Sequence, residues 1–275
     1  MTRLITSLFF GTALSLSLST YAQAHDFWLA PQNYYMEKAR PIPLAIMIGH
    51  PQDKSRWSLS PHRVVSLSSL GPNGITDHQN RMTPLTPTGD VILSLKDEGT
   101  HMVMIETTSA VSILPPEKFT DYVNEEGLTP IIAHRSEYEL NDEDGREIYS
   151  RRGKALVQIG DMTDQKAAYV TRPVGMTLEI VPQVNPYALK AGAELTSTVY
   201  YRGNPIEGVS IGLISLDTEK GLVRTQITNA EGQVSFDRPV TGQWMLHAVW
   251  SDPMENTLTA DYDTIFSSLS FGFNN

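Results

Sequence analysis

The sequence predicts an all-β protein made of two β-sandwich domains, the second immunoglobulin-like, with one short helix in the first. Short runs rich in Val, Ile, Thr, Tyr and Phe alternate with turns rich in Gly, Pro, Asn and Asp, which is typical of antiparallel sheets. A linker-like stretch at residues 171–175 precedes a cleaner strand pattern. We therefore expect an N-terminal metal-binding sandwich at residues 25–172 and a C-terminal sandwich at residues 175–275.

Residues 1–24 have the pattern of a cleavable signal peptide. Arg3 supplies the positive charge, residues 4–18 form the apolar run, and Ala22-Gln23-Ala24 is a small-x-small cleavage signal. The apolar run is short for a stable membrane span, and the chain has no cysteine to carry a lipid. We expect release into the periplasm, with no stable membrane insertion after cleavage and His25 as the first mature residue.

The predicted N-terminal domain contains strand signals and one helix signal. Pro115-Pro116 opens a helix that Gly127 closes, and its apolar residues recur at helical spacing. The turn at residues 97–99 should join two of the strands into a pair, and residues 137–145 form an acidic turn. The segments predicted as strands are residues 41–48, 63–70, 91–96, 102–107 and 155–159.

In the predicted C-terminal domain, Gly, Asn and Pro residues separate short strands. Residues 195–201 and 209–215 flank one turn, and residues 223–228 should meet residues 233–236 across another. Along residues 244–250 the Trp-bearing side should face the core, and we expect His247, on the other side, to be structural. The remaining predicted strands are residues 178–182 and 264–273.

Charge and composition exclude several classes of function. The formal net charge is −10, which disfavours nucleic acid and anionic membranes as partners. The absence of cysteine removes disulfides and thiolate ligands, so a metal site would use nitrogen, oxygen or Met sulfur. The sequence has no Gly-x-Ser-x-Gly or His-Glu-x-x-His motif, so hydrolase chemistry has no support.

His25 and His50 are the candidate metal ligands. After cleavage, the α-amino nitrogen and the imidazole Nδ1 of His25 could chelate one cation, and His50 would add a third nitrogen. Such a T-shaped or square-planar set suits Cu(II) or Ni(II) better than tetrahedral Zn(II). The alternative is that His25 merely follows the cleavage site and His50 merely ends a strand. Further possible ligands are Asp26, Asp53, His101 and His134. The two aspartates could instead orient an imidazole, although residues of this kind more often form turns or are solvated.

Several motifs together resemble a bacterial periplasmic family of poorly known function, whose members are assigned as soluble components of nickel or cobalt uptake systems. The resemblance covers essentially the whole mature chain. It implies binding of Ni(II) or Co(II) in support of an inner-membrane transporter, and by position it extends to His25 and His50. The motifs are at residues 24–31, 49–50, 119–122, 125–128, 147–157, 175–181, 185–186, 203–205 and 208–209.

Three functions follow from these observations. The first is non-enzymatic periplasmic binding of Ni(II), Co(II) or Cu(II) for metal uptake or homeostasis. The second is a mono-copper oxidoreductase, because an N-terminal histidine with one internal histidine also resembles the copper-binding brace of oxygen-activating polysaccharide enzymes. The third is a structural or interaction module that binds no metal.

Overall fold

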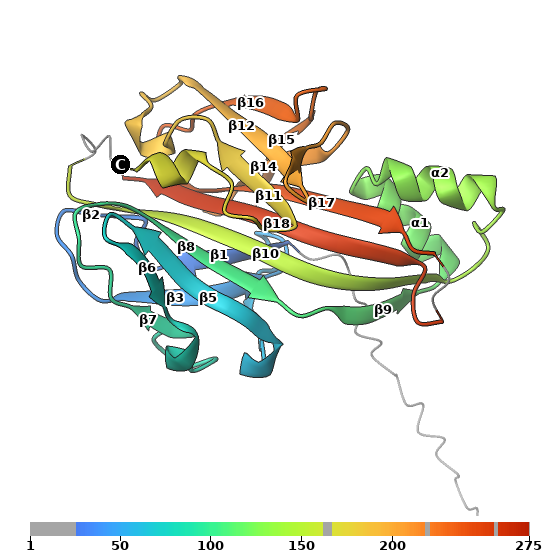
Figure 1. Cartoon of the computed structure of the whole chain (residues 1–275), viewed down its shortest axis with the longest axis horizontal. Helices are drawn as coiled ribbons and strands as arrows, with labels where there is room; N and C mark the ends of the chain where they lie inside the picture. Colours follow the sequence, from blue (N-terminus) through green and yellow to red (C-terminus); the bar gives the residue numbers. More distant parts are fainter. Residues whose placement is uncertain (1–25, 162–166, 218–220, 256–257, 275) are drawn as a thin grey trace, which may run out of the picture.

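The computed structural model describes residues 26–161, 167–217, 221–255 and 258–274. The strands of these residues form three layers (Figure 1). A central ten-stranded sheet has a four-stranded sheet packed on each face. The protein is therefore mostly β, with two β-sandwiches that share the central layer, and the second sandwich is immunoglobulin-like.

The first outer sheet consists of β1 (Phe27–Pro31), β3 (Ile42–Ile48), β4 (Ser55–Arg56) and β7 (Val91–Leu93). The central sheet runs in the order β15 (Leu222–Ile227), β14 (Ser210–Ser215), β17 (Gly242–Pro253), β18 (Tyr262–Phe273), β10 (Gly145–Ile159), β8 (Gly99–Thr107), β5 (Val64–Gly71) and β6 (Gly74–Asp77). Two short strands, β2 (Tyr35–Met36) and β9 (Ala110–Leu114), also pair with β10. The second outer sheet consists of β11 (Leu178–Pro182), β12 (Glu194–Tyr201), β13 (Asn204–Pro205) and β16 (Gln233–Asp237).

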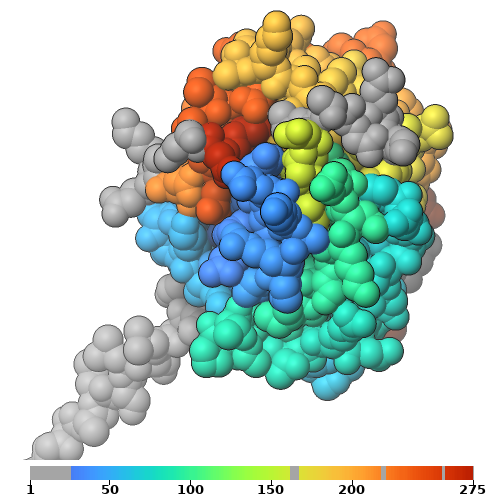
Figure 2. All heavy atoms as spheres, turned by 90° about the vertical axis from the view of Figure 1, so that its left-hand side faces the viewer, coloured from blue at the N-terminus to red at the C-terminus, as the bar shows by residue number. Residues whose placement is uncertain are grey.

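Long strands hold the two sandwiches together. The 15 residues of β10 pair antiparallel with β8 on one side and parallel with β18 on the other. Strand β18 in turn pairs with β17 along its full length of 12 residues. At the end of the molecule seen in Figure 2, the segment that contains β2 lies beside the end of β10 and the C-terminal strand.

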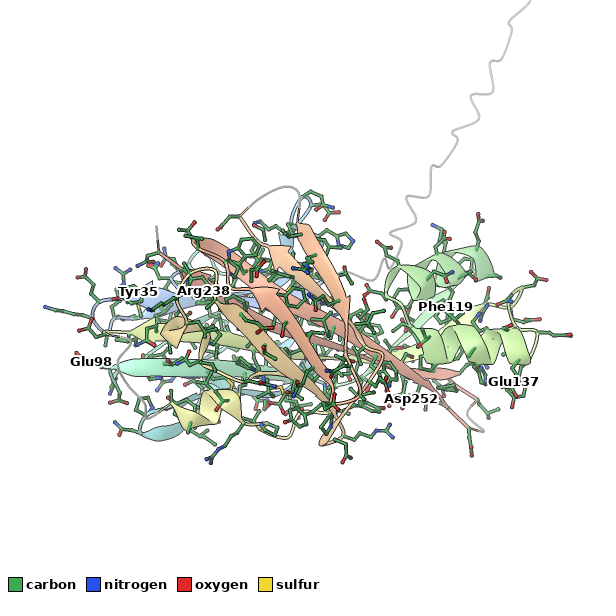
Figure 3. The ribbon with its side chains drawn as sticks, turned by 90° about the horizontal axis from the view of Figure 1, so that it is seen from above. Tyr35, Glu98, Phe119, Glu137, Arg238 and Asp252 are labelled. Carbon is green, nitrogen blue, oxygen red and sulfur yellow. The ribbon has the colours of Figure 1, made fainter. Side chains whose placement is uncertain are left out.

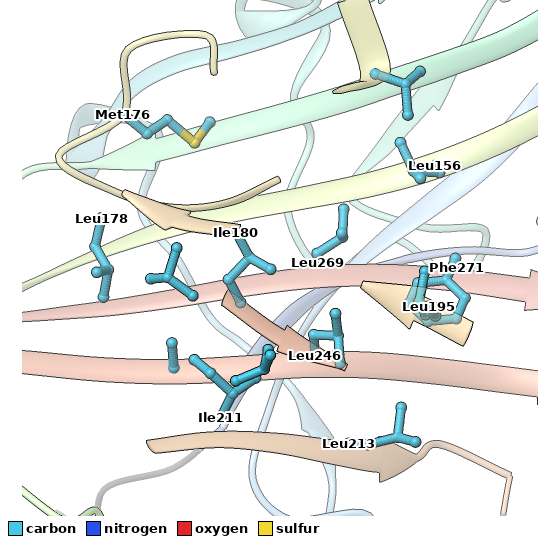
Figure 4. Close-up of a cluster of buried hydrophobic side chains, with 14 of the residues drawn as sticks. Leu156, Met176, Leu178, Ile180, Leu195, Ile211, Leu213, Leu246, Leu269 and Phe271 are labelled. Atoms are coloured by element: carbon cyan, nitrogen blue, oxygen red, sulfur yellow. The ribbon is translucent and has the colours of Figure 1, made fainter. Parts of the chain in front are cut away.

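Both faces of the central sheet are buried, because side chains alternate between them along each strand. Val103 and Ile105 of β8 lie in the core under the first outer sheet. Met102 and Met104 of the same strand lie in the core under the second outer sheet. Figure 4 shows part of this second core, which contains Leu246 and Phe271 of the central sheet together with Leu178 and Ile180 of the second outer sheet.

The strand positions are confirmed, but two predicted pairings are wrong. Strand β7 pairs with β3 in an outer sheet, and β8 pairs with β5 and β10 in the central sheet. Strands β12 and β14 also belong to different sheets, as do β15 and β16. The turns between them connect two layers of a sandwich, so a turn signal alone does not distinguish such a connection from a hairpin.

The predicted helix forms α1 (Pro116–Glu125), and a second helix that the sequence analysis did not predict, α2 (Thr129–Glu137), follows it directly. Phe119, Tyr122 and Val123 of α1 pack on Tyr262 and Phe266 of β18. Figure 3 shows Phe119 and Glu137 at one end of the molecule, with Tyr35 and Glu98 at the other. Neither α1 nor α2 nor any other helix in the described segments combines the length and apolar character needed to cross a membrane.

A buried ion pair connects the central sheet to the second outer sheet. Lys154 Nζ of β10 lies 2.9 Å from Glu179 Oε1 of β11, and both side chains are 1% exposed. Burial lowers the pKa of Lys154 despite the attraction of Glu179. The same carboxylate accepts hydrogen bonds from the backbone N–H groups of Val174, Gly175 and Met176. Glu179 therefore fixes the segment that leads into β11.

The substitution Lys154→Met should lower the free energy of unfolding by about 3–5 kcal/mol, because it leaves the Glu179 carboxylate buried without its counter-charge. Adding Glu179→Gln should recover part of that loss, since the amide is neutral and keeps an acceptor oxygen for the three N–H groups. Urea denaturation of the single and double variants measures both effects. A double variant less stable than Lys154→Met would contradict this account.

Candidate functional site

A cavity of about 220 Å³ lies between the first outer sheet, the end of α1 and the edge of the central sheet. The ionisable residues in its wall come from four segments of the chain. Asp26 precedes β1, His50 follows β3, Glu125 and Glu126 end α1, and His247 lies on β17. The rest of the wall is formed by Pro51, Gln52, Ser210, Gly212, Ile214, Leu222 and Thr225.

Asp26 stands between the two histidines. Its Oδ2 lies 3.4 Å from Nδ1 of His50, and its Oδ1 lies 3.5 Å from Nε2 of His247. The Nε2 atom of His247 is also 3.7 Å from Oε2 of Glu126. These distances are within ion-pair range and longer than those of well-formed hydrogen bonds. Asp26 is only 6% exposed, so its charge acts on both rings with little screening by solvent.

Local backbone geometry positions His50. Gly49 adopts φ +109°, and a Cβ there would lie 3.1 Å from the carbonyl oxygen of Asp53. Gly49 N–H also donates to the carbonyl oxygen of Asp26 at 3.0 Å, which holds the end of β3 beside the start of β1. Asp53 accepts a hydrogen bond from the backbone N–H of His50 at 2.8 Å. Asp53 therefore forms a turn with His50 in the described structure, which is one of the roles that the sequence analysis gave it.

His247 is buried on the face of β17 opposite Leu246 and Ala248. It pairs in register with Gly212 of β14. Neither ring nitrogen of His247 has a hydrogen-bond partner in the described part of the chain. Its only polar neighbours at ion-pair distance there are the carboxylates of Asp26 and Glu126.

The carboxylates favour the protonated form of both imidazoles. The interaction with Asp26 raises the pKa of His50, outweighing partial burial, and Asp53 and Glu125 add smaller effects in the same direction. Burial acts to lower the pKa of His247, but Asp26 and Glu126 together outweigh it, so its pKa is also raised. The cavity thus attracts positive charge.

The other two candidate histidines lie elsewhere. His101 borders a different cavity, and its Nε2 lies 2.9 Å from the carbonyl oxygen of Asp97. His134 lies on α2 against the rings of Tyr138 and Tyr262. Neither residue lines the cavity that contains Asp26 and His50.

His247 and Glu126, which form the charged contacts of the cavity with Asp26, were missed by the sequence analysis. His247 was expected to be structural, and Glu126 was noted only as part of a motif, because nothing in their spacing links them to Asp26. His25 and the predicted signal peptide lie outside the described residues. Among the residues that the structure describes, no three His, Asp or Glu side chains are grouped as they would be around a metal ion. Instead, Asp26 contacts His50 and His247, and His247 contacts Asp26 and Glu126.

The fold and the cavity define a β-sandwich protein with two imidazoles and several carboxylates that line one cavity. The chain belongs to the DUF4198 family, a domain of unknown function whose model matches residues 22–252. No curated protein matches the sequence. Among solved structures, the D0-D1 domain of Intimin is similar at 11% identity and a TM-score of 0.21, covering 90% of this chain and 98% of that chain.

The substitution Asp26→Asn should lower the pKa of both His50 and His247, because it removes the charge that favours their protonated forms. Imidazole resonances followed by NMR across a pH titration measure this directly. The signal of His101, which does not line the cavity, should titrate as in the wild type and is the internal control.

The same substitution should change stability in a defined pH range. A raised pKa stabilises the fold fully below the unfolded value of about 6.5, and this contribution is lost as the pH rises through the folded value. The stability difference between wild type and Asp26→Asn should therefore be largest below about pH 6.5 and shrink above it. A difference that grows with pH would contradict the assignment.

Proposed function

We propose that the protein binds a divalent transition metal, Ni(II), Co(II) or Cu(II), in the periplasm in support of metal uptake or homeostasis. In this proposal the mature N-terminal residue His25 and His50 are ligands, as the sequence analysis expects. His247, Asp26 and Glu126 join them as additional ligands or as groups that orient the imidazoles.

The observation that carries the proposal is the position of Asp26. It contacts His50 and His247 at once, although the three residues are far apart in sequence. Residue 25 is bonded to Asp26, and consecutive Cα atoms are about 3.8 Å apart. A mature terminus at His25 would therefore begin next to two imidazoles and a buried carboxylate.

The donor set suits the proposed cations. Imidazole nitrogen binds Ni(II), Co(II) and Cu(II) well, and carboxylates can complete the coordination. Nδ1 of His247 is buried without a hydrogen-bond partner in the described residues, and a buried polar group without a partner is costly. Its Nε2 has only the two carboxylates there at ion-pair distance. A cation at this position would satisfy a nitrogen of His247 and lie close to the carboxylates that now attract protons.

The periplasmic location and the transporter partner are supported by the sequence alone. The leader pattern of residues 1–24 supports export and cleavage. The resemblance to proteins of nickel and cobalt uptake systems supports an inner-membrane metal transporter as a partner that receives the cation.

The test is calorimetric titration of Ni(II), Co(II), Cu(II) and Zn(II) into mature protein that begins at His25. The substitutions His50→Ala and His247→Ala should each weaken binding of the preferred metal at least about tenfold, which corresponds to about 1.4 kcal/mol. The matched control is His62→Ala, because His62 is exposed and lies outside the cavity. If either cavity variant binds the metal as tightly as the wild type, the histidine replaced in that variant is not a ligand.

Adding one residue before His25 should weaken binding by a similar factor, because the α-amino nitrogen becomes an amide and no longer binds the metal as an amine. Affinity should also fall as the pH is lowered, since protons compete for His50 and His247, whose pKa values are raised. Calorimetry of the extended protein, and of the mature protein at several pH values, measures both effects.

Absence of metal binding would favour an interaction module, and peroxide- or oxygen-dependent turnover by the copper-loaded protein would favour the oxidoreductase.

A further inference from the structure

We propose that a second cavity, which shares no lining residue with the cavity around Asp26, binds a small hydroxylated carboxylate of the size of one sugar acid. This second cavity has a volume of about 300 Å³ and lies at the edge of the central sheet formed by β5 and β6. Its lining also includes the segment that follows β7 and the first residues of β8. The inference goes beyond the proposed function and does not depend on metal binding.

The lining of the second cavity is almost entirely polar. Sites for small organic molecules usually have volumes of about 300–1,000 Å³ and mostly apolar walls. This cavity is at the lower end of that range, and Leu95 is the one large apolar side chain in its lining. The ligand should therefore be small and polar over most of its surface. The polar residues of the lining are Ser69, Asn73, Thr76, Arg81, Ser94, Lys96, Asp97 and His101.

Two cations on the rim of the cavity are available to an anion. Arg81 and Lys96 are exposed, and within the described chain no ion pair or side-chain hydrogen bond engages either of them. Asp97 is the one carboxylate in the lining, so positive charge exceeds negative charge there by one, although the whole chain carries a formal net charge of −10. An anion with a single charge matches this excess. A carboxylate can accept charge-assisted hydrogen bonds from both cations.

His101 provides a buried hydrogen-bond acceptor on the floor of the cavity. The residue is 4% exposed, and its Nε2 lies 2.9 Å from the carbonyl oxygen of Asp97. Because a carbonyl oxygen only accepts, Nε2 carries the proton and donates it. Burial lowers the pKa of His101, which favours the neutral ring and leaves Nδ1 as an acceptor. No described residue donates to Nδ1, so a hydroxyl of the ligand would supply that hydrogen bond.

The rest of the floor is fixed in place by the strands. Ser69 is 2% exposed, and its Oγ lies 2.8 Å from Nε2 of the buried His78. Gly71 follows on the same face of β5, and a Cβ there would overlap Nδ1 of His101. The absence of a side chain at Gly71 therefore makes room for the imidazole. The floor thus presents a hydroxyl and an imidazole in defined positions below the two cations.

These two parts of the cavity together define the chemical class of the ligand. A carboxylate without hydroxyls would engage Arg81 and Lys96 but leave His101 without a donor. A neutral sugar would engage the floor but leave the two cations without a counter-charge. A hydroxylated carboxylate satisfies both parts at once.

The experiment is an NMR titration of metal-free mature protein with glucuronate at fixed pH. We expect a saturable shift of the imidazole resonances of His101, with those of His50 and His247 unchanged. Glucose, acetate and inorganic phosphate, each added alone, should bind at least about tenfold more weakly than glucuronate, because each lacks one of the two kinds of group or carries excess charge. Absence of a saturable shift of His101, or binding of any of these three compounds as tight as that of glucuronate, would overturn the inference.

Substitution of the two cations tests the location of the site. Arg81→Gln and Lys96→Gln should each weaken glucuronate binding at least about tenfold, because each removes a charge-assisted hydrogen bond. Both residues are exposed, so the midpoint of thermal unfolding should be unchanged. The matched control is Lys190→Gln, since Lys190 is exposed and lies outside the cavity. If both cavity variants bind glucuronate as tightly as the wild type, the second cavity is not its site and the inference is wrong.

Discussion

Burial of both faces of the central sheet is the constraint on which the rest of the structure depends. Strands β10, β17 and β18 are long enough to extend beyond either outer sheet, and their pairing joins N-terminal and C-terminal segments in one layer. Each outer sheet then buries its apolar side against a different face. Polar groups that point inward from the central sheet must find partners there, as Lys154 does with Glu179.

The candidate site is a direct consequence of this layering. Pairing of β1 with β3 brings Asp26 to the end of the strand that precedes His50. The face of β17 that does not contact the second outer sheet directs His247 toward the same place. Helix α1 packs on β18 through Phe119, so that Glu126 at its end closes the cluster. No two of these segments are neighbours in sequence, so the cluster exists only in the folded chain.

Local patterns predicted most strands and α1, but they could not predict how the strands are distributed among layers. The alternation in residues 244–250 correctly indicated a buried face with Leu246 and Ala248. It also made the opposite face appear outward, whereas Met245, His247 and Val249 are buried there by other parts of the chain. His50 was identifiable because it follows a strand and a glycine in a recognised motif. His247 was not, because its partners Asp26 and Glu126 are supplied by distant segments.

The position of Asp26 also explains why signal-peptide cleavage would matter to the proposed function. Before cleavage, the nitrogen of residue 25 belongs to a peptide bond, and its lone pair is delocalised and unavailable to a metal. After cleavage it is an amine beside a carboxylate that lies within 3.5 Å of two imidazoles. On this proposal the uncleaved chain lacks one donor and binds the cation less well than the mature protein. Export and metal binding are then linked by chemistry, because the complete ligand set exists only on the side of the membrane where cleavage occurs.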